Sequence, residues 1–275
     1  MPKVSVVIPT IPGREDMLKR LLSTIPNDYE TIVVGDEDLL LAAKRNKGAR
    51  QASGQYLLFI DDDNYLRDGA IENMLKHFKE ATGAMGMVAC YSDKKMLVAD
   101  GGSKRNYLTG FTKGINTNKK IYNINLLRVE RIYQVDEVAN AFMIRKEVFD
   151  DAGGLDEVNF PIDLDEADIC KRMKDMGYKI VMNPNAICYH NSQTYSHIPD
   201  FRRPMNSYFM ARNKVLFQKK HLSKLQYLVY LMIFMPITWA GYMVCLTYRG
   251  KAWMCYHFTK GIIEGLSGRK KNRYQ

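Results

Sequence analysis

The segment Gln55-Tyr-Leu-Leu-Phe-Ile-Asp-Asp-Asp-Asn64 runs an apolar stretch directly into three adjacent carboxylates. Tyr56–Ile60 is short, apolar and partly aromatic, and Gly54 precedes it, which is the pattern of a buried strand. Open α/β sheets bind their ligands in a crevice at the carboxyl ends of parallel strands. The acids at 61–63 therefore indicate a candidate ligand site.

Three neighbouring carboxylates repel one another, and a divalent cation is the simplest counter-charge for them. Mg²⁺ and Mn²⁺ take one or two carboxylates and leave coordination positions for substrate phosphates. Because alternate side chains of an extended segment share a face, Asp61 and Asp63 can converge while Asp62 points elsewhere. Taken alone, the segment also fits a solvated acidic turn after an edge strand.

The composition is that of a globular chain with a basic C-terminal third. The 275 residues are 46% hydrophobic and 25% charged, with a formal net charge of +10, which allows one large domain or one domain with an appendage. Residues 201–224 contain seven Lys or Arg and no acid, and residues 249–275 contain seven Lys or Arg and one Glu. Such a surface suits nucleic acid or the anionic cytoplasmic leaflet of a membrane.

The five cysteines are odd in number and show no CxxC spacing. They form neither a zinc pattern nor a disulfide framework, which favours a reducing compartment. At the N-terminus the apolar run Val4–Ile8 is interrupted by Ser5 and ends at Pro9. This run is too short for the apolar core of a signal peptide, and none is expected.

Residues 1–190 alternate strand-like and helix-like segments, which predicts an α/β domain with a mixed, mostly parallel sheet flanked by helices. The expected strands lie at 4–8, 31–34, 56–60, 138–144, 179–182 and 186–190. The expected helices lie at 15–25, 40–52, 69–81, 146–152 and 165–176. Residues 92–134 lack a regular pattern and are expected to include a mobile substrate loop.

Residues 226–248 form a run of 23 residues without a formal charge, long enough to span roughly 30 Å of hydrocarbon. If this run spanned a bilayer, the basic tail would lie opposite the N-terminal domain, against the positive-inside tendency. A re-entrant or interfacial helix pair bent near Pro236 avoids that conflict, and we expect membrane contact through it. A buried pair of core helices is the alternative.

Several motifs follow one another in a fixed order along the chain. They are Val7-Ile-Pro-Thr10, the strand-end acids Asp36 and Asp38, Ala42-Ala-Lys-Arg-Asn-Lys-Gly-Ala-Arg50, the acids at 61–63, Gly153-Gly-Leu-Asp156, Asn159-Phe-Pro-Ile-Asp-Leu-Asp-Glu-Ala-Asp-Ile-Cys-Lys-Arg172, Gly177-Tyr-Lys-Ile180, Ala186-Ile-Cys-Tyr-His190 and Ser207-Tyr-Phe-Met-Ala-Arg-Asn213. This ordered series resembles the family-2 glycosyltransferases of the GT-A fold, over roughly residues 4–215, and in particular the rhamnosyltransferases and related enzymes of cell-surface glycan assembly.

The resemblance implies a GT-A catalytic domain over 1–215 and a membrane-associated helical region over 216–275. The nucleotide-sugar half of the domain would end near residue 100, and the acceptor half would follow it. The implied activity is an inverting, metal-dependent transfer of a sugar from a nucleotide-sugar donor to a hydroxyl of a lipid-linked or cell-surface glycan, at the cytoplasmic face of a membrane with an anionic surface.

Other functions remain open at this stage. A polyprenyl-phosphate sugar synthase is the main alternative, and a nucleotidyltransferase or a catalytically inactive scaffold are further ones. A nucleotidyltransferase would want a glycine-rich phosphate loop after the first strand, and Pro9-Thr-Ile-Pro-Gly-Arg14 is a poor one. The basic clusters flank apolar segments and no nucleic-acid-binding motif accompanies them, so nucleic acid is not expected as a partner.

The resemblance also assigns binding residues. A divalent cation, Mn²⁺ or Mg²⁺, is expected on Asp61, Asp63 and His190, where it would bridge the donor's phosphates and stabilise the leaving charge. The residues expected to contact the nucleotide-sugar are Pro9, Thr10, Asp36, Arg45, Asn46 and Asp62. The family often has two polar residues after the second strand, whereas this chain has Gly35-Asp36, so the nucleotide's base stays open.

The catalytic base is expected at the start of the helix at 165–176. A carboxylate must accept the proton of the attacking hydroxyl, and the amide groups at a helix N-terminus favour a carboxylate there. The family's base is the Asp of a Glu-Asp pair, but this chain has the order Asp165-Glu166. Alignment therefore places Glu166 in the base position, with Asp165 as its rival. Asp168 is expected to contact the acceptor or to cap the helix.

Overall fold

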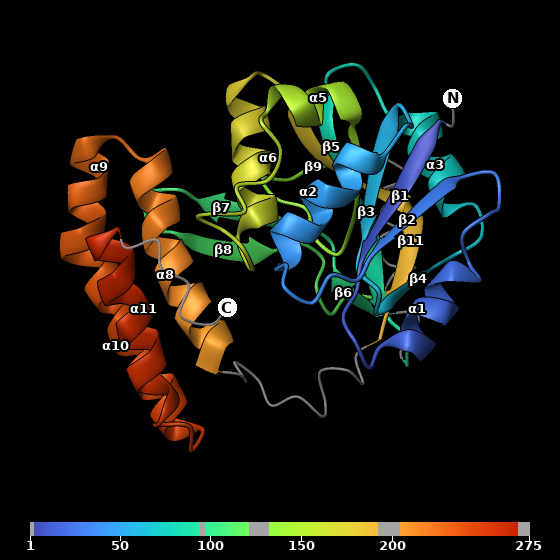
Figure 1. Cartoon of the computed structure of the whole chain (residues 1–275). Helices are drawn as coiled ribbons and strands as arrows, with labels where there is room; N and C mark the ends of the chain where they lie inside the picture. Colours follow the sequence, from blue (N-terminus) through green and yellow to red (C-terminus); the bar gives the residue numbers. More distant parts are fainter. Residues whose placement is uncertain (1–2, 94–96, 121–131, 192–203, 269–275) are drawn as a thin grey trace.

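The computed structural model describes residues 3–93, 97–120, 132–191 and 204–268. Within these residues the chain forms an α/β domain and, beside it, a unit of helices from the C-terminal third (Figure 1). The irregular stretch expected at 92–134 lies partly outside the described residues, and so do the ends of the two basic segments.

The α/β domain is built on a mixed sheet. Its main path follows the order β2 (Glu30–Val34), β1 (Val4–Pro9), β3 (Tyr56–Ile60), β10 (Ala141–Arg145), β5 (Thr82–Tyr91), β11 (Lys179–His190) and β4 (Asn64–Leu66). The pairs β2/β1, β1/β3 and β5/β11 are parallel, whereas β10 runs antiparallel between β3 and β5. The short strands are β6 (Val98–Asp100) on β5, β9 (Tyr133–Gln134) on β11, and the separate pair β7 (Ser103–Asn106) and β8 (Phe111–Gly114).

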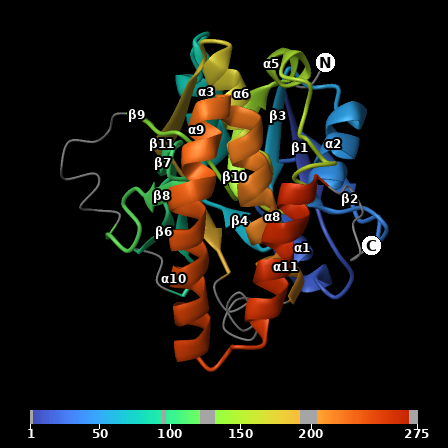
Figure 2. The ribbon, with the colours of Figure 1, turned by 90° about the vertical axis from the view of Figure 1, so that its left-hand side faces the viewer.

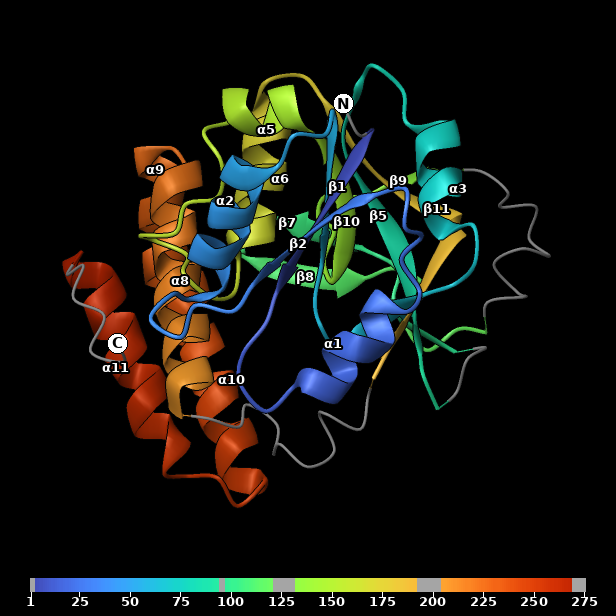
Figure 3. The ribbon, with the colours of Figure 1, turned by 45° about the vertical axis from the view of Figure 1, so that its right-hand side comes forward.

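Helices cover both faces of this sheet (Figure 3). One face carries α2 (Leu41–Gln51), α5 (Lys146–Asp151) and α6 (Asp165–Asp175), and the other carries α1 (Glu15–Leu22) and α3 (Ala70–His77). Alternation along β1 supplies both cores, because Val7 packs in the first cluster while Val6 and Ile8 pack in the second. The predicted fold class, a mostly parallel sheet flanked by helices, is confirmed.

Strand β5 was not expected from the sequence. Its residues are buried up to Cys90, but the two glycines within Thr82–Tyr91 are more typical of a loop than of a strand. Packing explains them, because a Cβ added at Gly86 would lie 2.5 Å from the sulfur of Met182. The expected helix at 69–81 is correspondingly shorter and ends at His77, before β5 begins.

The strands expected at 179–182 and 186–190 are joined in one strand, β11. Its register with β5 shifts between Asn183 and Ile187, and Pro184 lies within this interval. Because proline has no N–H to donate to a neighbouring strand, it is tolerated at such an irregularity. The interruption expected near Pro184 is therefore absent, and β11 continues through the proline.

Within the described residues, the C-terminal unit consists of long helical segments (Figure 2). They are α8 (Pro204–His221), the continuous helix Lys224–Tyr248 and α11 (Met254–Ser267). The continuous helix comprises α9 (Lys224–Val229), the π-helical turn η1 (Tyr230–Phe234) and α10 (Met235–Tyr248). The boundary expected at residues 215 and 216 falls inside α8.

The expected helix pair bent near Pro236 is corrected to one continuous helix. The π-helical turn ends at Phe234, two residues before Pro236, and the helix continues through the proline. A buried core pair is also not what the structure shows, because only 11% of the most apolar window of this helix is buried. The helix is 25 residues long, and its most apolar window has a mean hydropathy of 1.8. By length and composition it is therefore a candidate membrane span.

Candidate active site

The buried guanidinium of Arg45 joins the acids at the end of β3 to the acids at the start of α6. Its Nη2 donates to Asp61 Oδ1 at 2.7 Å, and its Nη1 donates to Asp165 Oδ2 and to Glu166 Oε1, both at 2.8 Å. Arg45 has no exposed side-chain surface. Burial lowers the pKa of Arg45, but the three carboxylates outweigh it and hold the pKa well above its ordinary value. Residues distant in sequence therefore form one charged cluster.

The two rival base carboxylates have different environments. The side chain of Asp165 is fully buried, and burial together with its neighbour Glu166 raises the pKa of Asp165 well above its ordinary value. Glu166 is 16% exposed and lines a cavity of about 140 Å³ together with Asp100, Gly102, Ser103, Glu137, Val138, Ala139, Asp163, Leu164 and Ala167. Of the two, Glu166 is the one that a bound molecule can reach.

Asp63, the residue directly before β4, lies beside His190, the last residue of the neighbouring strand β11. Asn64 of β4 is in register with His190, and this pairing brings His190 Nε2 to 3.7 Å from Asp63 Oδ1. Burial and the charge of Asp61 raise the pKa of Asp63 to about 7. Burial and the nearby Arg14 lower the pKa of His190 to about 4, so its imidazole is neutral at pH 7.

Asp61, Asp63 and His190 have the side-chain chemistry that a divalent cation needs, but their present positions do not form a complete ligand set. Crowded carboxylates and a neutral imidazole are ligands for a borderline cation such as Mn²⁺. Among the described residues, however, no group of three or more His, Cys, Asp or Glu side chains is arranged to hold a metal ion. The reason is that Asp61 is turned toward Arg45, while Asp63 and His190 approach each other.

Asp62 joins the end of β3 to the loop that follows β1. It accepts hydrogen bonds from Thr10 Oγ1 at 2.7 Å and from Arg14 Nη1 at 2.6 Å. Lys44 Nζ donates to the carbonyl of Thr10 at 2.6 Å. Arg14 was not predicted as a site residue, although its position in the loop directly after the first strand is the signal that could have identified it.

The remaining expected nucleotide contacts lie at the ends of β1 and β2. Pro9 is buried and in register with Val34 at the carboxyl end of β2. Asp36 follows that strand and pairs with Lys47 of α2 at 2.5 Å. A hydrogen bond from Lys47 holds the pKa of Asp36 below its usual range. Their expected contacts with the donor stay predictions.

Comparison with known proteins identifies the region that carries these acids. Residues 30–153 match the model of Glycosyl transferase family 2. This part of the chain, from the start of β2 to just beyond α5, is therefore similar to that family. No curated protein sequence matches the chain.

Two solved glycosyltransferase structures share the fold of this chain. The mannosyltransferase PcManGT from Pyrobaculum calidifontis, in complex with GDP-Man and Mn²⁺, is 14% identical with a TM-score of 0.56, and the match covers 98% of this chain and 88% of that one. GalNAc-T7 with UDP, GalNAc and Mn²⁺ is 15% identical with a TM-score of 0.54 over 77% of this chain. This chain spans half the length of GalNAc-T7. At these identities the likeness shows the fold.

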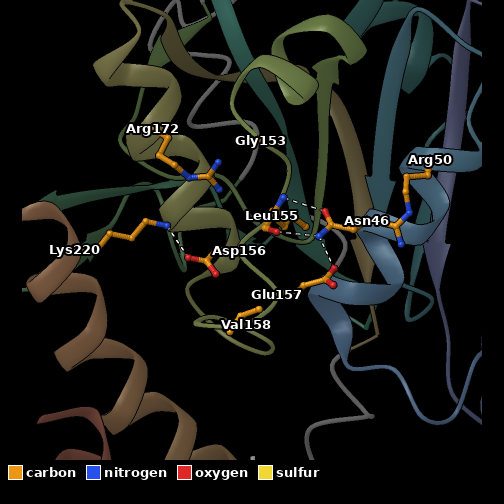
Figure 4. A pocket seen from close by; sticks show the side chains of 9 residues that line it. All are labelled: Asn46, Arg50, Gly153, Leu155, Asp156, Glu157, Val158, Arg172 and Lys220. Atoms are coloured by element: carbon orange, nitrogen blue, oxygen red, sulfur yellow. Dashed lines mark hydrogen bonds and ion pairs between the residues drawn. The ribbon is translucent and has the colours of Figure 1, made fainter. Parts of the chain in front are cut away.

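Asn46 of α2 holds a neighbouring loop in place (Figure 4). Its Nδ2 donates to the carbonyl of Leu155 at 2.9 Å and to Glu157 Oε2 at 2.6 Å, and its Oδ1 accepts from the amide of Leu155 at 2.9 Å. These residues border a cavity of about 430 Å³ whose other lining residues are Arg50, Gly153, Asp156, Val158, Arg172 and Lys220. The expected contact of Asn46 with the nucleotide stays a prediction, since both ends of its amide are engaged here.

Asp168 connects α6 to α8. Its carboxylate is fully buried and contacts Arg172 Nε, Lys220 Nζ and His221 Nε2, each at 2.8 Å. Burial raises the pKa of Asp168, but the bond from His221 and the charges of Arg172 and Lys220 outweigh it, so the pKa lies below its ordinary value. The acceptor contact expected for Asp168 stays a prediction, and in this structure its partners are residues of α6 and α8.

Proposed function

We propose that the chain is an inverting glycosyltransferase that moves a sugar from a nucleotide-sugar donor to a hydroxyl group of an acceptor. The observation that carries this proposal is the cluster around Arg45, which joins the strand-end acid Asp61 to Glu166 at the start of α6. A donor diphosphate at the strand ends would then lie beside a carboxylate that can accept a proton. The family match and the fold shared with sugar transferases support this assignment.

In the proposed reaction Glu166 is the base. Its carboxylate takes the proton of the acceptor hydroxyl as the hydroxyl oxygen attacks the anomeric carbon of the donor. A new carbon–oxygen bond forms on one face of the sugar. The bond to the diphosphate breaks on the opposite face, and its electron pair leaves on the nucleoside diphosphate. Arg45 Nη1 donates to Glu166 Oε1 at 2.8 Å and so orients the carboxylate of the proposed base.

A divalent cation is proposed for the same site. Asp63 and His190 would hold it, and Asp61 would join them on release from Arg45; the cation would supply positive charge for the leaving diphosphate. Arg14 lies 3.8 Å from Asp63 and bonds to Asp62, so it adds a fixed positive charge beside the position proposed for the phosphates. Both solved relatives contain Mn²⁺, which supports Mn²⁺ as the first cation to test.

The acceptor is proposed to be lipid-linked, at the cytoplasmic face of a membrane with an anionic surface. Large apolar side chains of the helix Lys224–Tyr248 face outward, with Leu225, Met232 and Val244 about 70% exposed. Basic residues flank the apolar stretch at Lys224, Arg249 and Lys251. An exposed apolar surface with basic flanks is typical of contact with anionic lipid.

A ligand-stabilisation screen tests this function directly. UDP-, GDP- and dTDP-sugars are added with Mn²⁺ or Mg²⁺, and the unfolding temperature of the full chain is followed, because a ligand that binds only the folded state raises it. We expect one nucleotide class to stabilise the protein with Mn²⁺ and not with EDTA. The product formed from that donor should carry the inverted anomeric configuration by nuclear magnetic resonance. Stabilisation by duplex DNA and by none of these donors would contradict the proposal.

A further inference from the structure

Two consecutive residues before α6 adopt a left-handed backbone conformation. Asp163 has a φ of 67° and Leu164 a φ of 66°, and residues other than glycine rarely adopt such angles. Such a conformation persists only where the surrounding structure holds it. Asp165 and Glu166 follow immediately, so this turn sets the direction in which both carboxylates enter the charged cluster around Arg45.

Asn213 of α8 holds this turn by two hydrogen bonds. Its Nδ2 donates to the carbonyl of Ile162 at 2.6 Å and to the carbonyl of Asp163 at 2.9 Å. The other end of the amide is also fixed, since Arg212 Nη1 donates to Asn213 Oδ1 at 2.9 Å and to the carbonyl of Asn159 at 2.8 Å. Asn213 is fully buried, so water does not compete for these bonds.

Close packing against α11 holds α8 itself in position. A Cβ added at Gly261 of α11 would lie 2.3 Å from the carbonyl oxygen of Tyr208, and one at Gly265 would lie 2.9 Å from that of Arg212. The two helix backbones therefore touch at the level of Arg212. Tyr208 also donates through its hydroxyl to Glu264. The position of Asn213 is thus fixed from the side of the helical unit.

We propose that Asn213 is a positioning residue for the transfer reaction. By holding the carbonyls of residues 162 and 163 it keeps the left-handed turn in place, and through that turn it directs Glu166 toward the cavity of about 140 Å³ that this carboxylate lines. This inference rests on the proposed function of Glu166 as the base. It assigns to the C-terminal unit a role in the geometry of the reaction, separate from its proposed contact with membrane.

Gln218 provides a matched control on the same helix. It is also fully buried, and its Nε2 donates to the carbonyl of Tyr107 at 2.7 Å and to that of Leu108 at 3.4 Å. The Asn213→Ala and Gln218→Ala variants therefore each remove one buried amide that contacts two carbonyls. Only the first of them removes support from the turn before Glu166.

The experiment compares steady-state transfer by the full-length variants with the donor found in the stabilisation screen. We expect Asn213→Ala to lower kcat at least tenfold with a donor KM within about twofold, because misplacement of a catalytic group by about 1 Å can cost about 100-fold in rate. Gln218→Ala should keep kcat within about twofold. Equal losses of kcat in the two variants would overturn the proposal. If Asn213→Ala does not fold, Asn213→Asp, which keeps the shape but lacks the N–H donor, takes its place.

Two further measurements separate this inference from the proposed function. Adding Asp163→Gly to Asn213→Ala should restore part of kcat, since glycine adopts a positive φ without strain; a double variant no faster than the single one contradicts the role of the turn. Amide hydrogen exchange over residues 162–168 should accelerate in Asn213→Ala and not in Gln218→Ala. Unchanged exchange would refute the inference even where transfer is observed, whereas faster exchange in a chain without transfer activity would refute only the proposed function.

Discussion

Most folded proteins bury apolar side chains and expose charged ones, and two regions of this chain do the opposite in different ways. The strand-end site buries charged groups, whereas the C-terminal helix exposes apolar side chains. At the site, the charged groups of Arg45, Asp165 and Asp168 are buried. On the helix, the apolar side chains of Met232 and Val244 are 71% and 70% exposed. Buried charge and exposed apolar surface are each unfavourable to the isolated fold. In both regions, the feature that is unfavourable for the isolated fold is the one on which the proposed function depends.

The two regions also differ in how they tolerate change. The buried ions depend on one another, because the loss of one leaves its partners charged and without water. The exposed apolar residues are largely independent, since each contributes its own area. Substitutions at the site should therefore have large, coupled effects, and substitutions on the helix should have smaller, additive ones.

The largest effect is expected from Arg45→Met. This change leaves Asp61, Asp165 and Glu166 without the cation they share, and breaking a buried ion pair typically costs about 3–5 kcal/mol. Urea unfolding at neutral pH measures the loss. The control is Lys47→Met on the same helix, whose pair with Asp36 is partly exposed and should contribute about 0–1 kcal/mol. Similar losses in the two variants would remove the distinction between buried and exposed charge.

Glu166→Gln should act on turnover and leave the fold intact. The amide keeps the shape of the side chain but cannot accept the hydroxyl proton, so the transfer rate at saturating donor should fall by about 10²–10⁴-fold. Donor affinity, measured separately by calorimetry, should stay unchanged. Asp165→Asn is the comparison and should lower the rate less, since Asp165 is buried behind Arg45. If Asp165→Asn is inactive while Glu166→Gln turns over, the base lies one residue earlier.

Asp63→Asn should weaken binding of the nucleotide-sugar in the presence of Mn²⁺ by on the order of 100-fold, because the cation loses a carboxylate ligand beside the diphosphate. Titration calorimetry with and without EDTA measures the change. Asp68→Asn, at an exposed acid just beyond β4, should bind the donor as the unaltered chain does. Undiminished binding by Asp63→Asn in the absence of any divalent cation would show that the site works without a metal.

The smallest effects are expected on the helix. Met232→Lys and Val244→Lys should each lower partition into anionic liposomes by roughly tenfold, since each removes one apolar side chain from the proposed membrane-facing surface. Co-sedimentation with vesicles measures the partition. Met176→Lys provides the control, because Met176 is exposed at the end of α6 in the other part of the molecule. If Met176→Lys lowers the partition into liposomes as much as the two helix variants do, net charge rather than this apolar face determines binding.

The elements that sequence predicted well are those with a local signal. Strand β3 was expected over the same residues, 56–60, because an apolar run bounded by Gly54 and by acids has one interpretation. Strand β5 was missed because its two glycines are explained by close packing against residues far along the chain, Gly83 against Tyr178 and Gly86 against Met182. Local pattern does not contain that information.

The same distinction applies to the site. The acids at 61–63 and at 165–166 could be found from the motifs that contain them. Their connection through Arg45 could not, because the hydrogen bonds of Arg45 join residues 16, 120 and 121 positions away. The motif identified Arg45 as a residue of interest, but only the packing shows that it faces three carboxylates. Likewise, the motif at 207–213 gave no sign of the turn that Asn213 holds.

The π-helical turn Tyr230–Phe234 has a consequence for how the outward surface is set. A π turn accommodates one additional residue within a continuous helix, and one residue corresponds to about 100° of rotation about the helix axis. The faces presented before and after the turn are therefore offset from each other, while the helix stays unbroken. Deleting a single residue within 230–234 would turn the whole of α10 by about that angle relative to α9 and direct a different set of side chains outward. The orientation of α10 about its axis thus depends on how many residues the π-helical turn contains, whatever those residues are.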